Sequence, residues 1–420
     1  MPVSTESKPL IRGWYVVGML FFVGCLNYLD RIMIATMRGS IISSIPMTEA
    51  EFGLLTSVFL WVYGLLSPFA GFLADRFSRS RVIVVSLFIW SMVTWMTAHA
   101  TTFYFLLTTR ALMGISEACF LPAALALIAD YHRGATRSLA TGIFLGGVMV
   151  GQSLGFLGGW IAEKHDWSTA FNVFGLIGIA FSILLVFCLK DAPESAHVKP
   201  SVANAPGRES LHKRINFFQA VRYLFAIRSF IILLAFWGVL GMIGWMIMAW
   251  LPTYYSEHFQ LSEATAGLYA TGYLYPVSLA GLVIGGVVAD RLTKRNRRAR
   301  ILVPAIGLLI ASPAIFLASS TTVVSVAIGC FIFYGFARIF SDGNLMPILC
   351  MIADKRYRAT GYGILNMFAC LVGGLGIYAS GALRDAHINL SVMFKIAAVS
   401  MVICSALLLM IKTKYDDTAS

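Results

Sequence analysis

Two stretches of the sequence repeat one another and decide the fold class: "GFLADRFSRSR" (71–81) and "GGVVADRLTKR" (285–295). A second pair, "IADYHRGATRSLATG" (128–142) and "IADKRYRATGYG" (352–363), follows in the same order. Both pairs occupy corresponding places in the two halves of the chain. We interpret them as the trace of an internal duplication, a pattern typical of membrane proteins built from two related helical bundles.

The sequence between these repeats is apolar. Of the 420 residues, 58% are hydrophobic and 12% are charged, whereas about a quarter of a soluble domain is charged. Runs of about 20 apolar residues predict membrane-spanning helices. Twelve are found, at 13–37, 52–74, 82–100, 103–130, 138–162, 168–189, 229–255, 264–289, 300–319, 322–352, 358–381 and 391–411. No ten-residue segment shows the alternation of a barrel strand. We therefore expect an all-α membrane protein.

The net charge of +12 raises the question of nucleic acid, and its distribution argues against that partner. With the N-terminus inside, most of the 32 Lys and Arg residues lie in cytoplasmic loops, which is the positive-inside pattern. Both termini are therefore predicted to be cytoplasmic. The seven Cys residues lie within apolar runs and are interpreted as packing residues. Residues 1–11 lack a small-residue cleavage site, so we expect the first span to be retained.

The chain divides into three parts. Residues 1–189 are predicted to form the first six-helix bundle and residues 229–420 the second. Residues 190–228 between them are polar and proline-containing, which predicts a cytoplasmic linker. The end of this linker, "INFFQAVRYLFAIRSF" (215–230), mixes aromatic and basic residues, so we expect an amphipathic helix at the membrane surface. A duplication of this kind places a substrate site between the bundles, near the middle of the membrane.

The repeated loop resembles the signature loop of the major facilitator superfamily. The resemblance extends over essentially the whole chain through its length, span count and linker. It implies twelve helices in two pseudo-symmetric bundles and a conformational latch in the loop. The alternative is a simple basic loop. The latch positions are Gly71, Asp75, Arg76 and Arg79, with a partial copy at Gly286, Asp290 and Arg291.

Charged residues inside the spans carry the functional information, because each would cost several kcal/mol facing lipid. They are Asp30, Arg31, Arg110, Glu117, Arg338 and Asp342. From the rise of 1.5 Å per residue, Arg31 and Arg110 lie about 10 Å below the outer surface. We expect an Asp30–Arg110 pair and a free Arg31, with Glu117 nearer the midplane. A static charge network that only holds the helices together is the alternative.

This arrangement suits the binding of an anion with protons. A substrate carboxylate would complete the pairing of Arg31 through a bidentate fork. Glu117 has no basic residue close in sequence and is the better proton carrier. Protonation of Asp30 would release Arg110 and so link the two binding events. Arg338 and Asp342, at i and i+4, are interpreted as a self-satisfied salt bridge, with substrate contact as the alternative.

"NYLDR" (27–31), Tyr63, Arg110, Glu117 and "WLPTYY" (250–255) together resemble the anion:cation symporter branch of the superfamily. That branch includes hexuronate, sugar-acid, aromatic-acid and sialin-like carriers. The resemblance implies that Arg31 contacts the substrate anion, that Asp30 and Glu117 take protons, and that Arg110 senses them. Tyr63 is expected on the cavity wall, with a packing tyrosine as the alternative. Further polar wall positions are Asn27, Tyr28, Gln152, Asn344 and Asn366.

Two other functions share parts of the pattern. Spinster-like lysolipid carriers also have an Asp-Arg pair on the first helix and Arg and Glu on the fourth, but the polar tally favours a small solute. The glycine series at 147, 151, 155 and 159 loosely resembles the antiporter motif of exporters, yet it lacks the proline of that motif. Close helix packing explains it. A function other than transport would be that of a membrane enzyme or a sensor. The sequence has no HExxH motif, GxSxG motif or Cys/His cluster with metal-ligand spacing to support an enzyme.

The sequence therefore predicts a secondary transporter that imports a small organic anion, a sugar acid such as a hexuronate or aldonate. Protons, or sodium ions in their place, would drive the uptake. We expect a monomer in the bilayer of a bacterial inner membrane. No catalytic residue, cofactor, metal or nucleic-acid partner is expected.

Overall fold

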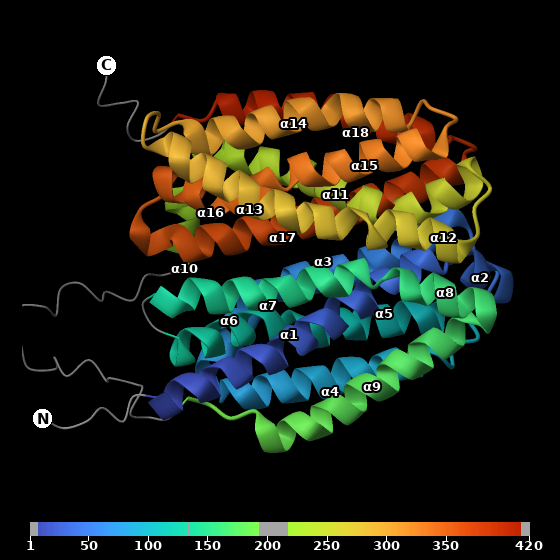
Figure 1. Ribbon diagram of the computed structural model, residues 1–420, viewed down its shortest axis with the longest axis horizontal. Coiled ribbons are helices and arrows are strands. Elements are labelled where there is room, and N and C mark those ends of the chain that lie inside the picture. Colours follow the sequence, from blue (N-terminus) through green and yellow to red (C-terminus); the bar gives the residue numbers. More distant parts are fainter. Residues whose placement is uncertain (1–6, 133–134, 193–216, 413–420) are drawn as a thin grey trace, which may run out of the picture.

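The computed structural model describes residues 7–132, 135–192 and 217–412, and these ranges contain helices and no strand. Twelve helical spans in them are long and apolar enough to cross a membrane, which confirms the predicted number. Figure 1 shows the helices side by side along the long axis, with both termini at the same end. The middle of the predicted linker, 193–216, lies outside the described residues.

The first six spans lie within α1–α9, of which α2 belongs to no span and connects the first span to the second. The helices are α1 (Ser7–Thr36), α2 (Arg38–Ser44), α3 (Glu49–Arg76), α4 (Arg79–Thr97), α5 (Phe103–Ala118), α6 (Phe120–Tyr131), α7 (Ala135–Ser153), α8 (Phe156–Lys164) and α9 (Trp167–Cys188). Together α5 and α6 make one span, as do α7 and α8.

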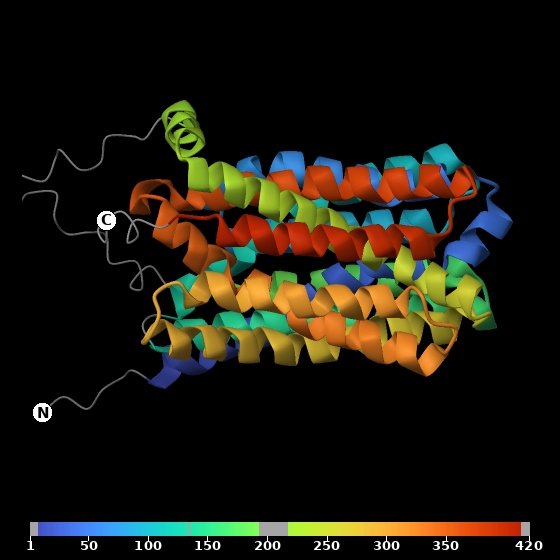
Figure 2. The ribbon, with the colours of Figure 1, turned by 90° about the horizontal axis from the view of Figure 1, so that it is seen from above.

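The second six spans begin after α10 (Phe217–Ala226). They are built from α11 (Arg228–His258), α12 (Glu263–Gly267), the π-helical turn η2 (Leu268–Gly272), α13 (Leu274–Thr293), α14 (Ala299–Ala318), α15 (Val324–Arg338), α16 (Phe340–Ile352), the 3₁₀ turn η3 (Lys355–Tyr357), α17 (Arg358–Asp385) and α18 (Leu390–Leu409). Figure 2 shows α10 outside the bundles, at the end where the termini lie. Its position at a membrane surface remains a prediction.

Short loops start several spans with side-chain caps. The carboxylate of Asp166 accepts a hydrogen bond of 2.6 Å from the backbone N–H of Thr169 at the start of α9. Hydrogen bonds from Ser168 and Thr169 hold the pKa of Asp166 below its usual value. Thr102 caps α5 in the same way. Such caps satisfy backbone N–H groups that have no partner inside the helix, so the turns between spans are defined locally.

Two spans are broken beside charged residues. α5 ends at Ala118, and α6 begins at Phe120. The cause lies in the sequence, because the ring of Pro122 cannot coexist with a regular helix around the carbonyl four residues earlier, at Ala118. Glu117 is therefore next to an irregular turn. In the second half, the break at Ile339 separates α15 from α16 next to Arg338.

The predicted close packing of the glycine series is confirmed. A Cβ atom at Gly147 would overlap the backbone carbonyl of Phe21, and one at Gly151 would overlap that of Cys25. Gly155 faces Ile32, which lies on α1 like Phe21 and Cys25. The missing side chains thus let α1 and α7 approach at backbone contact, as small residues do in membrane bundles.

Gly151→Ala is expected to destabilise the protein by about 1–3 kcal/mol, the usual cost of overpacking. The midpoint of thermal unfolding in detergent measures this effect. Gly146→Ala on the same helix is the matched control, because a Cβ there meets nothing within 4 Å. Equal midpoints for the two variants would show that the glycine contact does not set the distance between α1 and α7.

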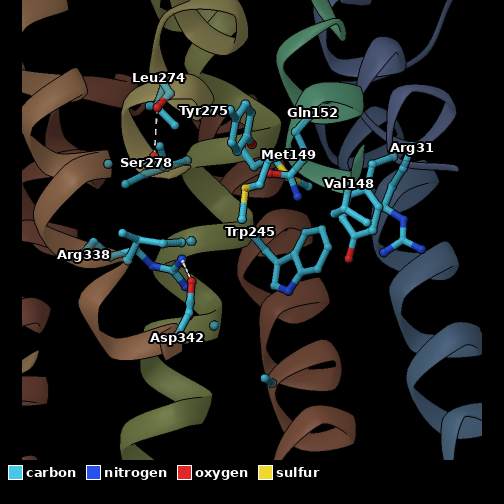
Figure 3. Close-up of a pocket in the computed structure, with 18 of the residues that line it drawn as sticks. Arg31, Val148, Met149, Gln152, Trp245, Leu274, Tyr275, Ser278, Arg338 and Asp342 are labelled. Atoms are coloured by element: carbon cyan, nitrogen blue, oxygen red, sulfur yellow. Dashed lines mark hydrogen bonds and ion pairs between the residues drawn. The ribbon is translucent and has the colours of Figure 1, made fainter. Parts of the chain in front are cut away.

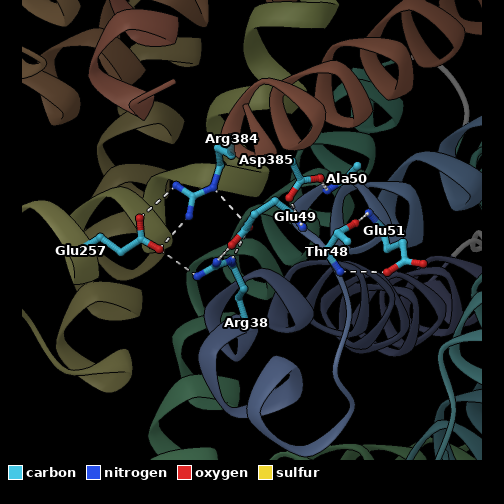
Figure 4. Close-up of polar contacts among 8 residues, drawn as sticks. All are labelled: Arg38, Thr48, Glu49, Ala50, Glu51, Glu257, Arg384 and Asp385. Atoms are coloured by element: carbon cyan, nitrogen blue, oxygen red, sulfur yellow. Dashed lines mark hydrogen bonds and ion pairs between the residues drawn. The ribbon is translucent and has the colours of Figure 1, made fainter. Parts of the chain in front are cut away.

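The end of the molecule opposite the termini is closed by ion pairs between the two halves (Figure 4). Arg38 pairs with Glu49 of its own half and, at 3.0 Å, with Glu257 of the other. Arg384 of the second half contacts Glu49 at 3.2 Å and Glu257 at 2.7 Å. Asp385 accepts hydrogen bonds of 2.9 Å from the backbone N–H groups that begin α3. We call Arg38, Glu49, Glu257 and Arg384 the ion-pair cluster.

Hydrogen bonds between the halves continue from the ion-pair cluster toward the middle of the molecule. Ser57 Oγ donates to the Gly374 carbonyl at 2.7 Å, and Trp61 Nε1 donates to the Leu371 carbonyl at 3.0 Å. On the other side of the bundle, Thr271 Oγ1 donates to the Ser153 carbonyl at 3.2 Å. These contacts hold α3 against α17 and α7 against η2 on the side of the molecule away from the termini.

The predicted latch region lies at the terminus-bearing end. Arg79 pairs with Asp130 and donates a 3.1 Å hydrogen bond to the Ala126 carbonyl. It therefore binds a facing acid and a carbonyl near a helix end, which joins the first repeated loop to the second repeated motif. In the second copy, Asp290 pairs with Arg300 at 2.9 Å. The surroundings of residues 71–75, which include Gly71 and Asp75, lie outside the description, and Arg76 and Arg291 are exposed.

Candidate functional site

A cavity of about 350 Å³ lies between the two halves. Figure 3 shows side chains of both halves around it. The first half contributes Tyr28, Arg31, Tyr63, Val148, Met149 and Gln152, and the second contributes Trp245, Tyr275, Ser278, Tyr334, Arg338, Asp342, Tyr362 and Asn366, among others. A cavity of this size, with polar groups set among apolar and aromatic side chains, is typical of a site for a small molecule.

Arg31 is the buried cation on the first wall. Its Nη2 donates a 2.6 Å hydrogen bond to Glu117 Oε2, and both side chains are almost fully shielded from solvent. The rings of Tyr28, Phe59 and Tyr63 surround the guanidinium at 4.4, 4.7 and 4.8 Å. Aromatic faces stabilise a desolvated cation and fix its plane. The guanidinium is thereby held at the cavity wall.

The structure corrects the predicted pairing. Arg31 is not free, because it holds Glu117, and Asp30 forms no ion pair with Arg110 among the described residues. Instead, Asp30 Oδ2 accepts a 3.2 Å hydrogen bond from Thr94, and its Oδ1 has no partner there. Asp30 and Arg110 remain near enough to interact electrostatically.

The error has a geometric cause. The prediction used depth in the membrane, which is nearly equal for Asp30 and Arg31. Neighbouring residues of a helix point about 100° apart, so they face different partners. Asp30 reaches α4 through Thr94, while Arg31 reaches α3 and α5. Arg110 lies two turns from Glu117 and contacts Met113 Sδ at 3.4 Å and the ring of Phe171.

Glu117 is the acid whose surroundings can change. Its Oε2 is held by Arg31, and its Oε1 has no hydrogen-bond partner among the described groups. Asn27 is buried beside it, without a hydrogen bond of ordinary geometry. A buried carboxylate held by one cation depends on that cation for its charge. Any group that draws Arg31 away would therefore act on Glu117.

Comparison with known proteins adds the family. The family model described as "Major Facilitator Superfamily" matches residues 20–377. The chain belongs to this superfamily of transporters. It is 28% identical to "Protein spinster homolog 3" of Danio rerio, over 91% of this chain and 79% of the relative. It is 26% identical to "Protein spinster homolog 1" of Xenopus tropicalis, over 88% and 72%. It is also 26% identical to the "Probable galactarate/D-glucarate transporter GarP" of Escherichia coli (strain K12), over 87% of each chain.

The solved structures support the fold. The crystal structure of a bacterial homologue of the human lysosomal transporter Spinster, inward-facing and unoccupied, superposes with a TM-score of 0.75. The alignment covers 96% of each chain at 23% identity. The occupied form gives a TM-score of 0.73 at 22% identity. The twelve-helix architecture of the transporter is therefore that of the superfamily.

The remaining predicted residues of the transporter divide into two groups. Tyr28, Tyr63, Gln152 and Asn366 are among the residues that line the cavity. Asn27 and Asn344 are not among them, although both are described. Asn344 donates a 2.9 Å hydrogen bond to the Phe340 carbonyl of its own helix. This hydrogen bond holds the Asn344 amide against its own helix, away from the residues that line the cavity.

Sequence reasoning missed the aromatic wall of the second half. Trp245, Tyr275 and Tyr334 line the cavity. Aromatic residues are common in membrane helices for packing and at interfaces, so their presence in a span does not show whether their side chains face the cavity. A search for aromatic residues within one turn of Arg338 would have found Tyr334, but also Phe336 and Phe340, which do not line the cavity. It would have missed Trp245 and Tyr275, which lie on different spans.

Arg338 and Asp342 form the predicted i,i+4 pair, at 2.7 Å. The pair is less buried than Arg31 and Glu117, with side-chain exposures of 20% and 28% against 3% and 0%. It lines the same cavity. Contact between the two side chains is therefore confirmed, and their position gives them access to whatever enters the cavity.

Proposed function

We propose that this transporter imports a small organic anion, a sugar acid such as a hexuronate or aldonate, together with protons. The observation that carries the proposal is the buried Arg31–Glu117 pair at the wall of a cavity between the bundles. The cavity has the size of a small-molecule site, and one relative is named as a galactarate/D-glucarate transporter. Sodium in place of protons remains an outcome of the test below.

The mechanism follows from competition for one guanidinium. With Glu117 ionised, Arg31 Nη2 is engaged, and an entering carboxylate meets a neutral pair. A proton on Glu117 removes the competing charge and frees the fork of Arg31 for the substrate. A bound carboxylate in turn favours the protonated acid, because the buried Glu117 then lacks its cation. Proton and anion thereby promote each other's binding, as linkage requires.

Asp30 and Arg110 form a second layer behind this pair. Asp30 is buried, with a single hydrogen bond from Thr94, and Arg110 is buried with two nitrogens lacking hydrogen-bond partners in the described structure. An acid without a contacting cation in an apolar site can take a proton. We propose Asp30 as a second proton site, whose charge is sensed by Arg110 across a short gap rather than by contact.

Alternating access needs one closed end at a time. We place both termini in the cytoplasm on the basis of the Lys and Arg distribution. We further propose that the chain is a monomer in the inner membrane of a bacterial cell. The ion-pair cluster, at the end opposite the termini, then closes the outer side, and this arrangement suits exchange of substrate with the cytoplasm. Opening to the outside requires Glu257 and Arg384 to leave Arg38 and Glu49.

A Spinster-like lysolipid carrier is the second candidate. The spinster relatives favour it, and so do apolar side chains of the cavity wall such as Val148, Met149 and Trp237. A lipid would need its chain to lie along these side chains while its headgroup reaches Arg31. The same cavity could therefore serve either cargo, and transport assays decide between them.

The test is uptake into proteoliposomes under an inward proton gradient, with a panel of uronates, aldonates, sialic acid, aromatic acids and a lysophospholipid. We expect saturable uptake of a sugar acid that rises with the pH gradient and acidifies the lumen. Protein-free liposomes are the control. Uptake driven only by a sodium gradient would show that sodium, and not the proton, is the coupling ion. Transfer of the lysophospholipid without sugar-acid uptake would reject the proposal.

A further inference from the structure

We propose that the cavity contains a second anion-binding site on the wall of the C-terminal half, centred on Arg338, and that the substrate carries two acidic groups. This inference rests on the proposed function and narrows the sugar acid to one with two carboxylates, an aldarate, in place of the hexuronates and aldonates, which carry one. Figure 3 shows Arg31 and Arg338 on opposite sides of the cavity, with Tyr275, Gln152 and Trp245 between them. A molecule with a carboxylate at each end of a hydroxylated chain would offer one carboxylate to each of the two arginines.

Arg338 has donors to spare. Its Nη1 donates to Asp342 Oδ2 at 2.7 Å, while its buried Nε has no hydrogen-bond partner among the described residues. An arginine carries five N–H donors in a fixed fork, so one monodentate contact leaves most of them unused. The Nε donor is shielded from the cavity in this structure, but the side chain as a whole is 20% exposed and lines the cavity, so a ligand there can meet its terminal nitrogens.

Backbone space is reserved for this guanidinium. A Cβ atom at Gly244 of α11 would lie 3.1 Å from Arg338 Nη2, so the glycine lets the charge rest against the neighbouring span. Tyr275 and Tyr334 stand close enough to interact with it electrostatically, and both line the cavity. Phenol hydroxyls can donate hydrogen bonds to a carboxylate that Arg338 binds.

A purely structural role explains the pair less well. Arg338 ends α15 and Asp342 lies in the first turn of α16, so the two charges belong to one span and join no two spans to each other. Apolar residues of similar volume would pack there without the cost of desolvating two charges. Charges that stay inside a membrane protein and face its cavity are functional-site candidates by default.

The two halves then present matching units. Arg31 is engaged by Glu117, and Arg338 by Asp342, each through one short ion pair. In each unit a substrate carboxylate can replace the protein carboxylate on the arginine. A monoacid can occupy only one unit, whereas a diacid bridges both halves across the cavity. Bridging gives the diacid a second charge-assisted contact, which is the source of its preference.

The experiment compares two sugar acids of the same carbon skeleton, galacturonate with one carboxylate and galactarate with two. Binding to the purified protein in nanodiscs gives both dissociation constants. We expect the wild type to bind galactarate at least about tenfold more tightly. Arg338→Gln should bring the ratio of the two affinities close to one, because the affinity for galactarate falls by about tenfold and that for galacturonate by much less.

Two further variants make the result decisive. Arg338→Gln with Asp342→Asn removes both charges, so no unpaired carboxylate is left buried if the single variant folds poorly. Arg356→Gln, an exposed arginine paired with Asp354, is the matched control and should keep the wild-type ratio. Equal binding of both acids by the wild type, or equal loss for both acids in Arg338→Gln, would overturn the second site and leave the proposed function intact. Failure of the wild type to bind either acid would overturn the second site. Absence of uptake across the whole panel of organic acids would overturn the proposed function as well.

Discussion

Replacing Arg31 with glutamine is expected to weaken the binding of the organic anion by at least about a hundredfold and to abolish uptake. Arg31 is the buried cation of the first cavity wall, held between three aromatic rings and Glu117. Glutamine keeps hydrogen-bonding capacity but removes the charge. Binding to the purified protein and initial uptake into proteoliposomes measure the two effects.

The controls separate lost recognition from lost folding. Arg31→Gln alone leaves Glu117 buried without its cation, so Arg31→Gln with Glu117→Gln, which removes both charges, should unfold at nearly the wild-type temperature and still not bind. Arg31→Lys should restore binding poorly, because an ammonium cannot reproduce the planar fork or its stacking on the rings. Wild-type affinity in the glutamine variant would show that Arg31 does not contact the substrate.

Replacing Glu117 with glutamine is expected to separate exchange from accumulation. The amide mimics a permanently protonated acid, so Arg31 stays available and substrate exchange across the membrane continues. No proton can be released, so a pH gradient cannot be used. Each coupled proton allows about a tenfold accumulation per pH unit. The ratio of internal to external substrate under a one-unit gradient should fall from about tenfold or more to about one.

The matched control for this variant is Glu51→Gln. Glu51 lies far from the cavity, where its carboxylate accepts a hydrogen bond from the Thr48 backbone at 2.8 Å. It should accumulate substrate like the wild type. Accumulation against the gradient by Glu117→Gln would show that another group, of which Asp30 is the next candidate, couples transport to protons.

The sequence alone determined the class of the fold and most of its plan. Twelve apolar runs predicted twelve spans, and the structure has them, because the length of an apolar helix is set locally by the thickness of the bilayer. The repeated loops predicted two related halves, and the charges inside apolar spans identified the candidate residues, since each must avoid lipid. The i,i+4 pair of Arg338 and Asp342 was predictable for the same local reason.

Only the tertiary structure decided which charges meet. Asp30 and Arg31 are neighbours at one depth, yet one faces Thr94 and the other Glu117, because their directions depend on how α1 is rotated against α4 and α5. The ion-pair cluster joins residues more than 200 positions apart, such as Arg38 and Glu257. The cavity brings Arg338 opposite Arg31. Hydropathy and spacing describe each helix about its own axis. The rotation and partners of a helix follow from packing against the others, which no single span encodes.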